Sequence, residues 1–74
     1  MIGQQFITES KIAQISQEYA KKKKISTDNA MRKFLNSTTY EILTDPETGL
    51  YLEMFEYVYE MFLKEKGELL DEEA

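Results

Sequence analysis

The 74-residue sequence contains no cysteine, no histidine and no tryptophan, and it has one proline and three glycines. Without cysteine the chain cannot form a disulfide or a thiolate metal site. Without histidine it lacks the commonest general base and a major zinc ligand. We therefore expect a protein that is not an enzyme, with no catalytic residue, no cofactor and no metal site.

Long apolar runs are also missing. No stretch approaches the roughly 20 apolar residues that a membrane-spanning helix needs. Residues 1–7 have neither a charged leading segment nor the apolar run of a signal peptide. These absences predict a cytoplasmic protein that does not enter a membrane.

The length and the charge distribution restrict the possible partners. A chain of 74 residues makes one domain, residues 1–74, and buries only about 60% of its unfolded surface, so its core is marginal. Residues 1–39 carry a net charge of +4, whereas residues 40–74 carry −9. Opposite charges of this kind attract within one molecule or between two copies. The overall charge of −5 argues against binding to the negatively charged nucleic-acid backbone.

The first half of the chain predicts two helices. After a lead-in over residues 1–7, Thr8 is a suitable N-cap, and the helix is expected to run to about residues 22–24. Its apolar stripe consists of Ile12, Ile15 and Tyr19. Ser26 or Thr27 is expected to cap a second helix. The buried face of that helix would be formed by Ala30, Met31, Phe34 and Leu35.

A short third helix and a turn follow. Thr38 and Glu41 have the spacing of a capping box, which predicts a helix start there. The segment 44–49 then contains the single proline of the chain. Asp45 can cap from the position before Pro46, and Gly49 permits a positive φ. We therefore predict a tight turn at this point.

The segment from Leu50 to Lys66 predicts a long aromatic-rich C-terminal helix. Eleven of the fourteen residues 50–63 are large and apolar or aromatic, and the exceptions are three glutamates. On a helical wheel the apolar arc covers about 240°, whereas an ordinary surface helix has an arc a little over 100°. Gly67 is a suitable stop, and residues 68–74 are expected to be an acidic, frayed tail. The sequence therefore predicts an all-α protein, a compact bundle of three to four helices.

The wide apolar arc suggests a protein interface. Phe55, Val58 and Phe62 are expected to face the core. Tyrosine and methionine are enriched in interface cores, and each large side chain contributes roughly 1.5–3 kcal/mol when it is buried. The residues predicted to contact another protein are Met54, Tyr57, Tyr59, Met61 and Leu63. Since a homodimer is the commonest way to bury such a face, self-association is the first expectation.

The sequence gives less support to a metal site, a catalytic site or a DNA-binding motif. The turn at Asp45 lacks the ligand spacing of an EF-hand, and the glutamates of the last helix occupy its polar strip. A helix-turn-helix could be built from residues 26–44, but its second helix has no basic residue for reading bases. The alternative function is a small nucleic-acid-associated regulator that uses the basic residues of the N-terminal half. Those residues are Lys21–Lys24, Arg32 and Lys33.

Three segments resemble a family of small, uncharacterised bacterial helical domains. They are EYAKKKKIST and the helix after it (18–35), STTYEILTDPETGLYLE (37–53) and EYVYEMF (56–62). Members of that family are often encoded beside ADP-ribosyltransferase-like, toxin-like proteins. The resemblance implies an antitoxin-like role, with a toxin-like protein as a further partner, and it implies no catalytic residue.

Overall fold

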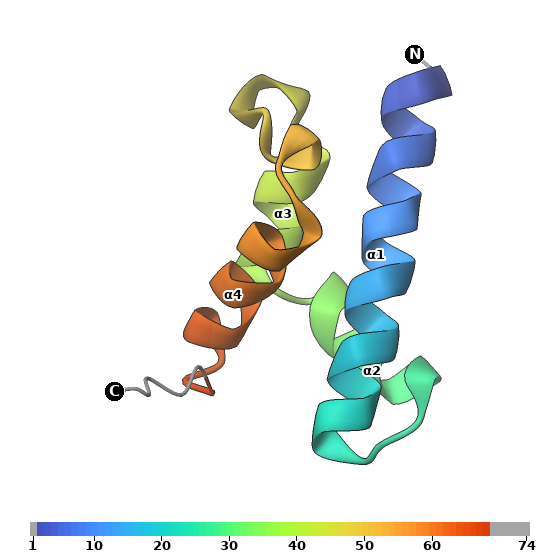
Figure 1. Ribbon diagram of the computed structural model, residues 1–74. Helices are drawn as coiled ribbons and strands as arrows, with labels where there is room; N and C mark the ends of the chain where they lie inside the picture. The colour runs from blue at the N-terminus through green and yellow to red at the C-terminus, as the bar shows by residue number, and fades with distance from the viewer. Residues whose placement is uncertain (1, 69–74) are drawn as a thin grey trace.

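The computed structural model describes residues 2–68, which form four α-helices and two short 3-10 helices and contain no strand (Figure 1). The elements are α1 (Ile2–Lys23), α2 (Thr27–Leu35), α3 (Thr38–Thr44), η1 (Pro46–Thr48), η2 (Leu50–Leu52) and α4 (Phe55–Glu65). The predicted all-α bundle is confirmed. The longest element is α1, with 22 residues, and α4 has 11.

Helix α1 begins earlier than the sequence predicts. It starts at Ile2, so the expected lead-in over residues 1–7 and the N-cap at Thr8 are wrong. Each residue added to an existing helix gains one hydrogen bond, and Gln4 and Gln5 are good helix formers. At the other end Lys24 adopts a positive φ of 57°, and the Ile25 amide donates to the Ala20 carbonyl over 3.1 Å. This left-handed residue ends α1 and turns the chain into α2.

Serine side chains cap α2 and α3. The Ser26 hydroxyl accepts from the Asn29 amide at 3.1 Å, so Ser26 and not Thr27 is the cap. The Ser37 hydroxyl accepts from the Tyr40 amide at 3.1 Å. The predicted cap at Thr38 is therefore wrong by one residue. Ser37 also donates its hydroxyl to the Phe34 carbonyl, which ties the end of α2 to the start of α3.

The turn after α3 has the predicted chemistry. The Asp45 carboxylate accepts from the Glu47 amide at 3.0 Å, Pro46 is the first residue of η1, and Gly49 has a φ of 70°. The continuous helix expected from Leu50 does not form, however. Residues 50–52 form η2, and Glu53 and Met54 are extended before α4 begins at Phe55. Leu50, on η2, is nevertheless buried in the core.

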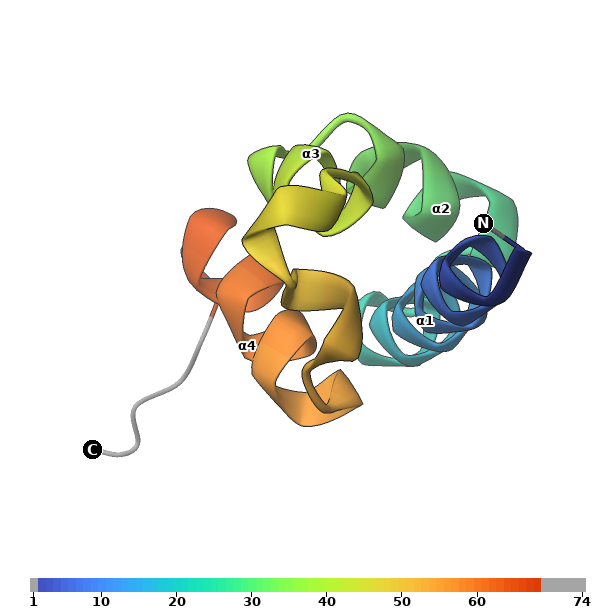
Figure 2. The ribbon, with the colours of Figure 1, turned by 90° about the horizontal axis from the view of Figure 1, so that it is seen from above.

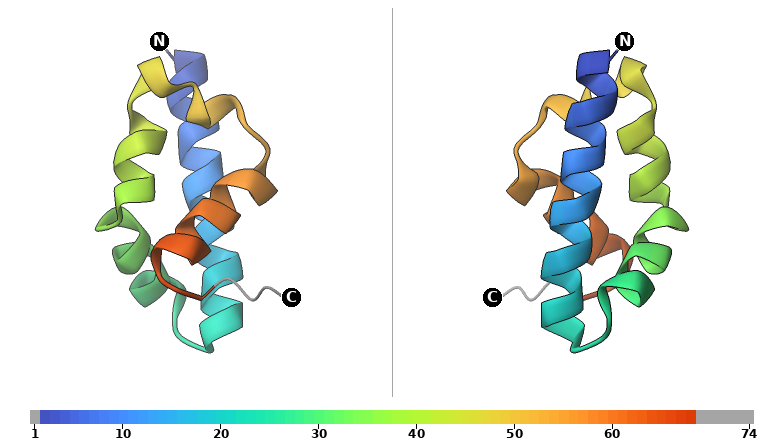
Figure 3. Two further views of the ribbon diagram at one scale, coloured as in Figure 1. Left: turned by 90° about the vertical axis from the view of Figure 1, so that its left-hand side faces the viewer. Right: turned by 90° about the vertical axis from the view of Figure 1, so that its right-hand side faces the viewer.

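The helices surround one core (Figure 2). At its centre the Phe62 ring meets the rings of Tyr19 and Phe34 edge to face, with centroid distances of 4.8 and 5.0 Å. These three rings come from α4, α1 and α2. Ile15, Leu43 and Val58 are further core residues and are fully buried. Helix α4 crosses α1 obliquely, so that the first and the last helix pack into the same core (Figure 3).

The end of α4 is closed by hydrogen bonds and one ion pair. Gly67 has a φ of 70°, and the amides of Gly67 and Glu68 donate to the carbonyls of Lys64 and Leu63 over 3.0 and 2.8 Å. The predicted stop at Gly67 is confirmed. Glu68 pairs with Lys23 Nζ at 3.0 Å, so this first residue of the expected frayed tail is held in place. The remainder of that tail, 69–74, lies outside the described residues.

Candidate protein-binding surface

Most of the wide apolar arc is covered by the bundle itself. Val58 and Phe62 are fully buried, and only 7% of Leu63 is exposed. The expectation that Leu63 lies on the surface is therefore wrong, because its side chain belongs to the core. Tyr59 and Met61 are half-buried, and the Tyr59 ring stacks on Phe55 with a centroid distance of 5.3 Å.

Two of the five predicted interface residues remain largely in solvent. Met54 is 69% exposed and Tyr57 is 54% exposed. Leu52, which the sequence analysis did not select, is 68% exposed because the break before α4 turns it away from the core. We call Leu52, Met54 and Tyr57 the exposed patch. In the described part of the chain, the other exposed large apolar side chains are Phe6 on α1, which is as open as Met54, and Leu35 on α2, which is less exposed.

The exposed patch has an acidic rim. Glu53, Glu56 and Glu60 alternate with its apolar side chains and are all exposed. The thirty residues 34–63 contain six acidic residues and no lysine or arginine. Neither ion pair among residues 2–68, Lys21–Glu18 and Lys23–Glu68, involves the rim. A partner that buries the patch must therefore also meet three unpaired carboxylates.

The tyrosines near the core are poor candidates for chemistry at neutral pH. Burial and then the neighbouring Glu68 carboxylate raise the pKa of Tyr19 to about 12. Burial, with the charges of Glu18 and Glu68, also raises the pKa of Tyr59. Both hydroxyls stay protonated, so neither supplies a phenolate nucleophile or base. Among residues 2–68, no three carboxylate side chains gather into a group that could hold a metal ion.

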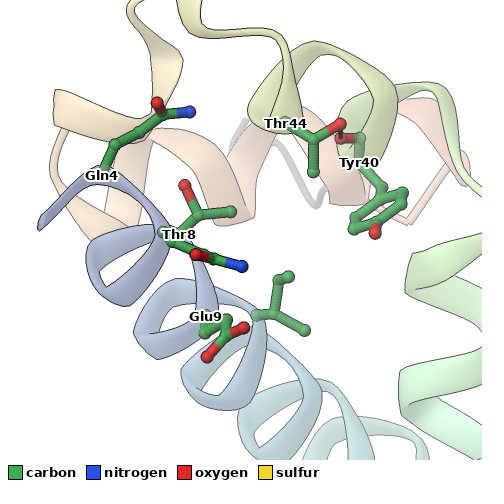
Figure 4. A pocket seen from close by; sticks show the side chains of 7 residues that line it. Gln4, Thr8, Glu9, Tyr40 and Thr44 are labelled. Atoms are coloured by element: carbon green, nitrogen blue, oxygen red, sulfur yellow. Dashed lines mark hydrogen bonds between the residues drawn. The ribbon is translucent and has the colours of Figure 1, made fainter. Parts of the chain in front are cut away.

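A hollow of about 370 Å³ lies between the N-terminal half of α1 and α3 (Figure 4). Its lining is mainly polar and consists of Gln4, Gln5, Thr8, Glu9, Ile12, Tyr40 and Thr44. Thr8 projects from α1 on the side that faces α3, and its buried hydroxyl forms no hydrogen bond with another described residue. A buried hydroxyl without a partner costs about 1–3 kcal/mol.

Replacing Thr8 with valine is therefore expected to raise the free energy of unfolding by about 1 kcal/mol. Valine has nearly the shape of threonine and no hydroxyl to desolvate. Urea denaturation followed by circular dichroism measures the change. Thr8→Ser is the matched control, since it keeps the hydroxyl and loses the methyl group, and it should lower stability. A Thr8→Val protein less stable than the wild type would mean that the hydroxyl has a partner.

Among residues 2–68, no helix has both the length and the apolar character to cross a bilayer. The chain matches no family model, no curated protein and no solved structure.

Proposed function

We propose that this protein is a non-enzymatic protein-binding module and that the exposed patch is its contact surface. The observation that carries the proposal is the run of three large, mostly exposed apolar side chains within six residues. A domain of this size has little apolar surface to spare, because its core is marginal. Methionine and tyrosine at the centre of a patch suit a contact that must adapt to a partner and exclude water.

The acidic rim indicates the chemistry of the partner. A protein surface that combines apolar side chains with lysine or arginine would cover the patch and pair with Glu53, Glu56 and Glu60. The resemblance of residues 18–62 to bacterial domains encoded beside toxin-like proteins supports a neighbouring gene product as one such partner. In that case the module acts as an antitoxin-like regulator.

Nucleic-acid binding is a weaker alternative. In a helix-turn-helix reading of residues 26–44, α3 would have to read base edges from its N-terminal end. That end is already occupied, because the Glu65 carboxylate accepts from the amides of Thr38 and Thr39 over 2.7 and 2.9 Å. A carboxylate at this position also repels phosphate. Absence of a gel shift with duplex DNA at low salt would remove this alternative.

The proposal is tested by measuring the affinity of the chain for the purified product of the adjacent gene. Met54→Glu and Tyr57→Glu should each weaken binding at least about tenfold, since truncation of a hot-spot residue costs about 2 kcal/mol or more. Phe6→Glu is the matched control, because Phe6 is as exposed as Met54 but lies on α1. Equal affinities for all four proteins would contradict the assignment of the patch.

A further inference from the structure

We propose that the exposed patch binds the basic corner of a second copy of this chain, so that copies associate head to tail. The basic corner is formed by Lys21, Lys22, Lys24 and Arg32 at the junction of α1 and α2. The inference rests on the proposed function, and it names the chain itself as one partner.

The corner has the chemistry that the acidic rim requires. All four of its basic side chains are exposed. Lys21 pairs with Glu18 at 3.7 Å, and the neighbouring Lys23 pairs with Glu68, so Lys22, Lys24 and Arg32 supply the charge that is not paired with a described residue. Apolar contact area lies further along α2, beyond the α1–α2 junction. On α2, Leu35 is 39% exposed, and Met31 is partly buried one turn before it. A basic surface with an apolar component is therefore present on every copy.

Within one molecule the acidic rim and the basic corner form no ion pair with each other among the described residues. The α1–α2 junction lies at one end of the bundle, and η1 and η2 lie at the other (Figure 1). Helix α4, which carries Glu56, Tyr57 and Glu60, lies between these two ends. Neither ion pair among the described residues joins the corner to Glu53, Glu56 or Glu60. Both surfaces therefore keep their charge available for another molecule.

Charge also favours head-to-tail association over a symmetric homodimer. A symmetric homodimer through the patch, the arrangement expected from the sequence, would bring Glu53, Glu56 and Glu60 of both copies together. Like charges in one interface cost free energy. A contact between patch and corner instead pairs opposite charges. Because the two contacting surfaces differ, the association is heterologous and produces rings or open chains.

Sedimentation velocity on the full-length protein tests the inference. At about 0.01 M salt, where the Debye length is about 30 Å, the weight-average mass should rise above that of the monomer as the protein concentration increases. At about 1 M salt, where the length is about 3 Å, the protein should be a monomer. A wild-type protein that remains monomeric at low salt at every concentration overturns the inference.

Two charge-reversed proteins give a sharper result. The double variant Lys21→Glu/Lys24→Glu loses the basic corner, and Glu53→Lys/Glu60→Lys loses the acidic rim. Each alone should be monomeric at low salt. A mixture of the two should associate, because the first keeps its patch and the second keeps its corner. Glu9→Lys/Glu41→Lys changes the net charge as much as the rim variant but lies away from both surfaces, and it should associate like the wild type.

The same proteins distinguish a symmetric contact. If reversal of the corner leaves self-association unchanged while reversal of the rim alters it, the contact is patch to patch and the inference is wrong. Circular dichroism of each variant confirms that it is folded. Failure of self-association would leave the proposed function standing if Met54→Glu still weakens binding to the neighbouring gene product and Phe6→Glu does not.

Discussion

Replacement of Phe62 by alanine is expected to lower the free energy of unfolding by about 3–5 kcal/mol. The value should lie near the upper end of this range, because the Phe62 ring makes edge-to-face contacts with Tyr19 and Phe34. Each such aromatic pair contributes about 0.5–1.5 kcal/mol beyond the buried area. A 74-residue domain has a total stability of about 4–11 kcal/mol. The substitution should therefore remove a large part of the total stability.

Urea denaturation followed by far-ultraviolet circular dichroism measures this loss. Phe62→Leu keeps most of the volume and should cost about 1.5 kcal/mol or less. Tyr57→Ala is the matched control on the same helix, because Tyr57 is an exposed aromatic residue outside the core. It should change stability by no more than about 0.5 kcal/mol. If Phe62→Ala and Tyr57→Ala had similar effects, the division of α4 into a core face and an exposed patch would be wrong.

The features that the sequence predicts correctly are those fixed by neighbouring residues. Ser26 caps a helix that starts one residue later, Asp45 caps the turn at Pro46, and Gly49 and Gly67 both adopt a positive φ. Each depends on side-chain chemistry or backbone freedom within a few residues. The apolar periodicity that places Ile15, Phe34 and Phe62 in one core is similarly local.

The features that the sequence does not predict depend on residues far apart in the chain. The break at Glu53 and Met54 exists because Leu50 is buried against other helices, and a helical wheel drawn over residues 50–66 cannot show it. That wheel places Leu52 and Leu63 on the same flank of the apolar stripe, and of the two only Leu63 was predicted to contact another protein. The packing of α4 against the other helices buries Leu63, whereas the break between η2 and α4 leaves Leu52 in solvent.

A second long-range feature joins α4 to α3. The carboxylate of Glu65 accepts from the Thr38 amide at 2.7 Å, from the Thr39 amide at 2.9 Å and from the Thr39 hydroxyl at 2.7 Å. Together with the Ser37 hydroxyl, which accepts from Tyr40, it satisfies the first three amides of α3. A negative charge at a helix N-terminus is favourable as well. Nothing local in the sequence reveals this cap, because 26 residues separate Glu65 from Thr39.

Glu65→Ala is therefore expected to lower the free energy of unfolding by about 2–3 kcal/mol at neutral pH. Hydrogen bonds to a charged group contribute about 1.5–3 kcal/mol, and loss of an N-cap typically costs about 1 kcal/mol. Urea denaturation again gives the measurement. Glu60→Ala is the control, since Glu60 is an exposed carboxylate on the same helix and caps nothing. Equal effects of the two substitutions would mean that the cap does not stabilise the fold.

The same contact predicts how stability depends on pH. Burial of Glu65 favours its neutral form, but the hydrogen bonds from Thr38 and Thr39 outweigh it and lower the pKa of the carboxyl below its usual 4.5. Because the pKa is lower in the folded state, the stabilisation is complete above about pH 4.5 and is lost as the pH falls through the folded-state pKa. Glu65→Gln keeps an acceptor that does not titrate, so stability should fall less steeply with acid. Some slope should remain, because the pKa of Glu68 is lowered too: burial raises it, but Lys23, Tyr19 and Lys22 together outweigh burial. An unchanged slope in Glu65→Gln would show that the carboxylate does not cap α3.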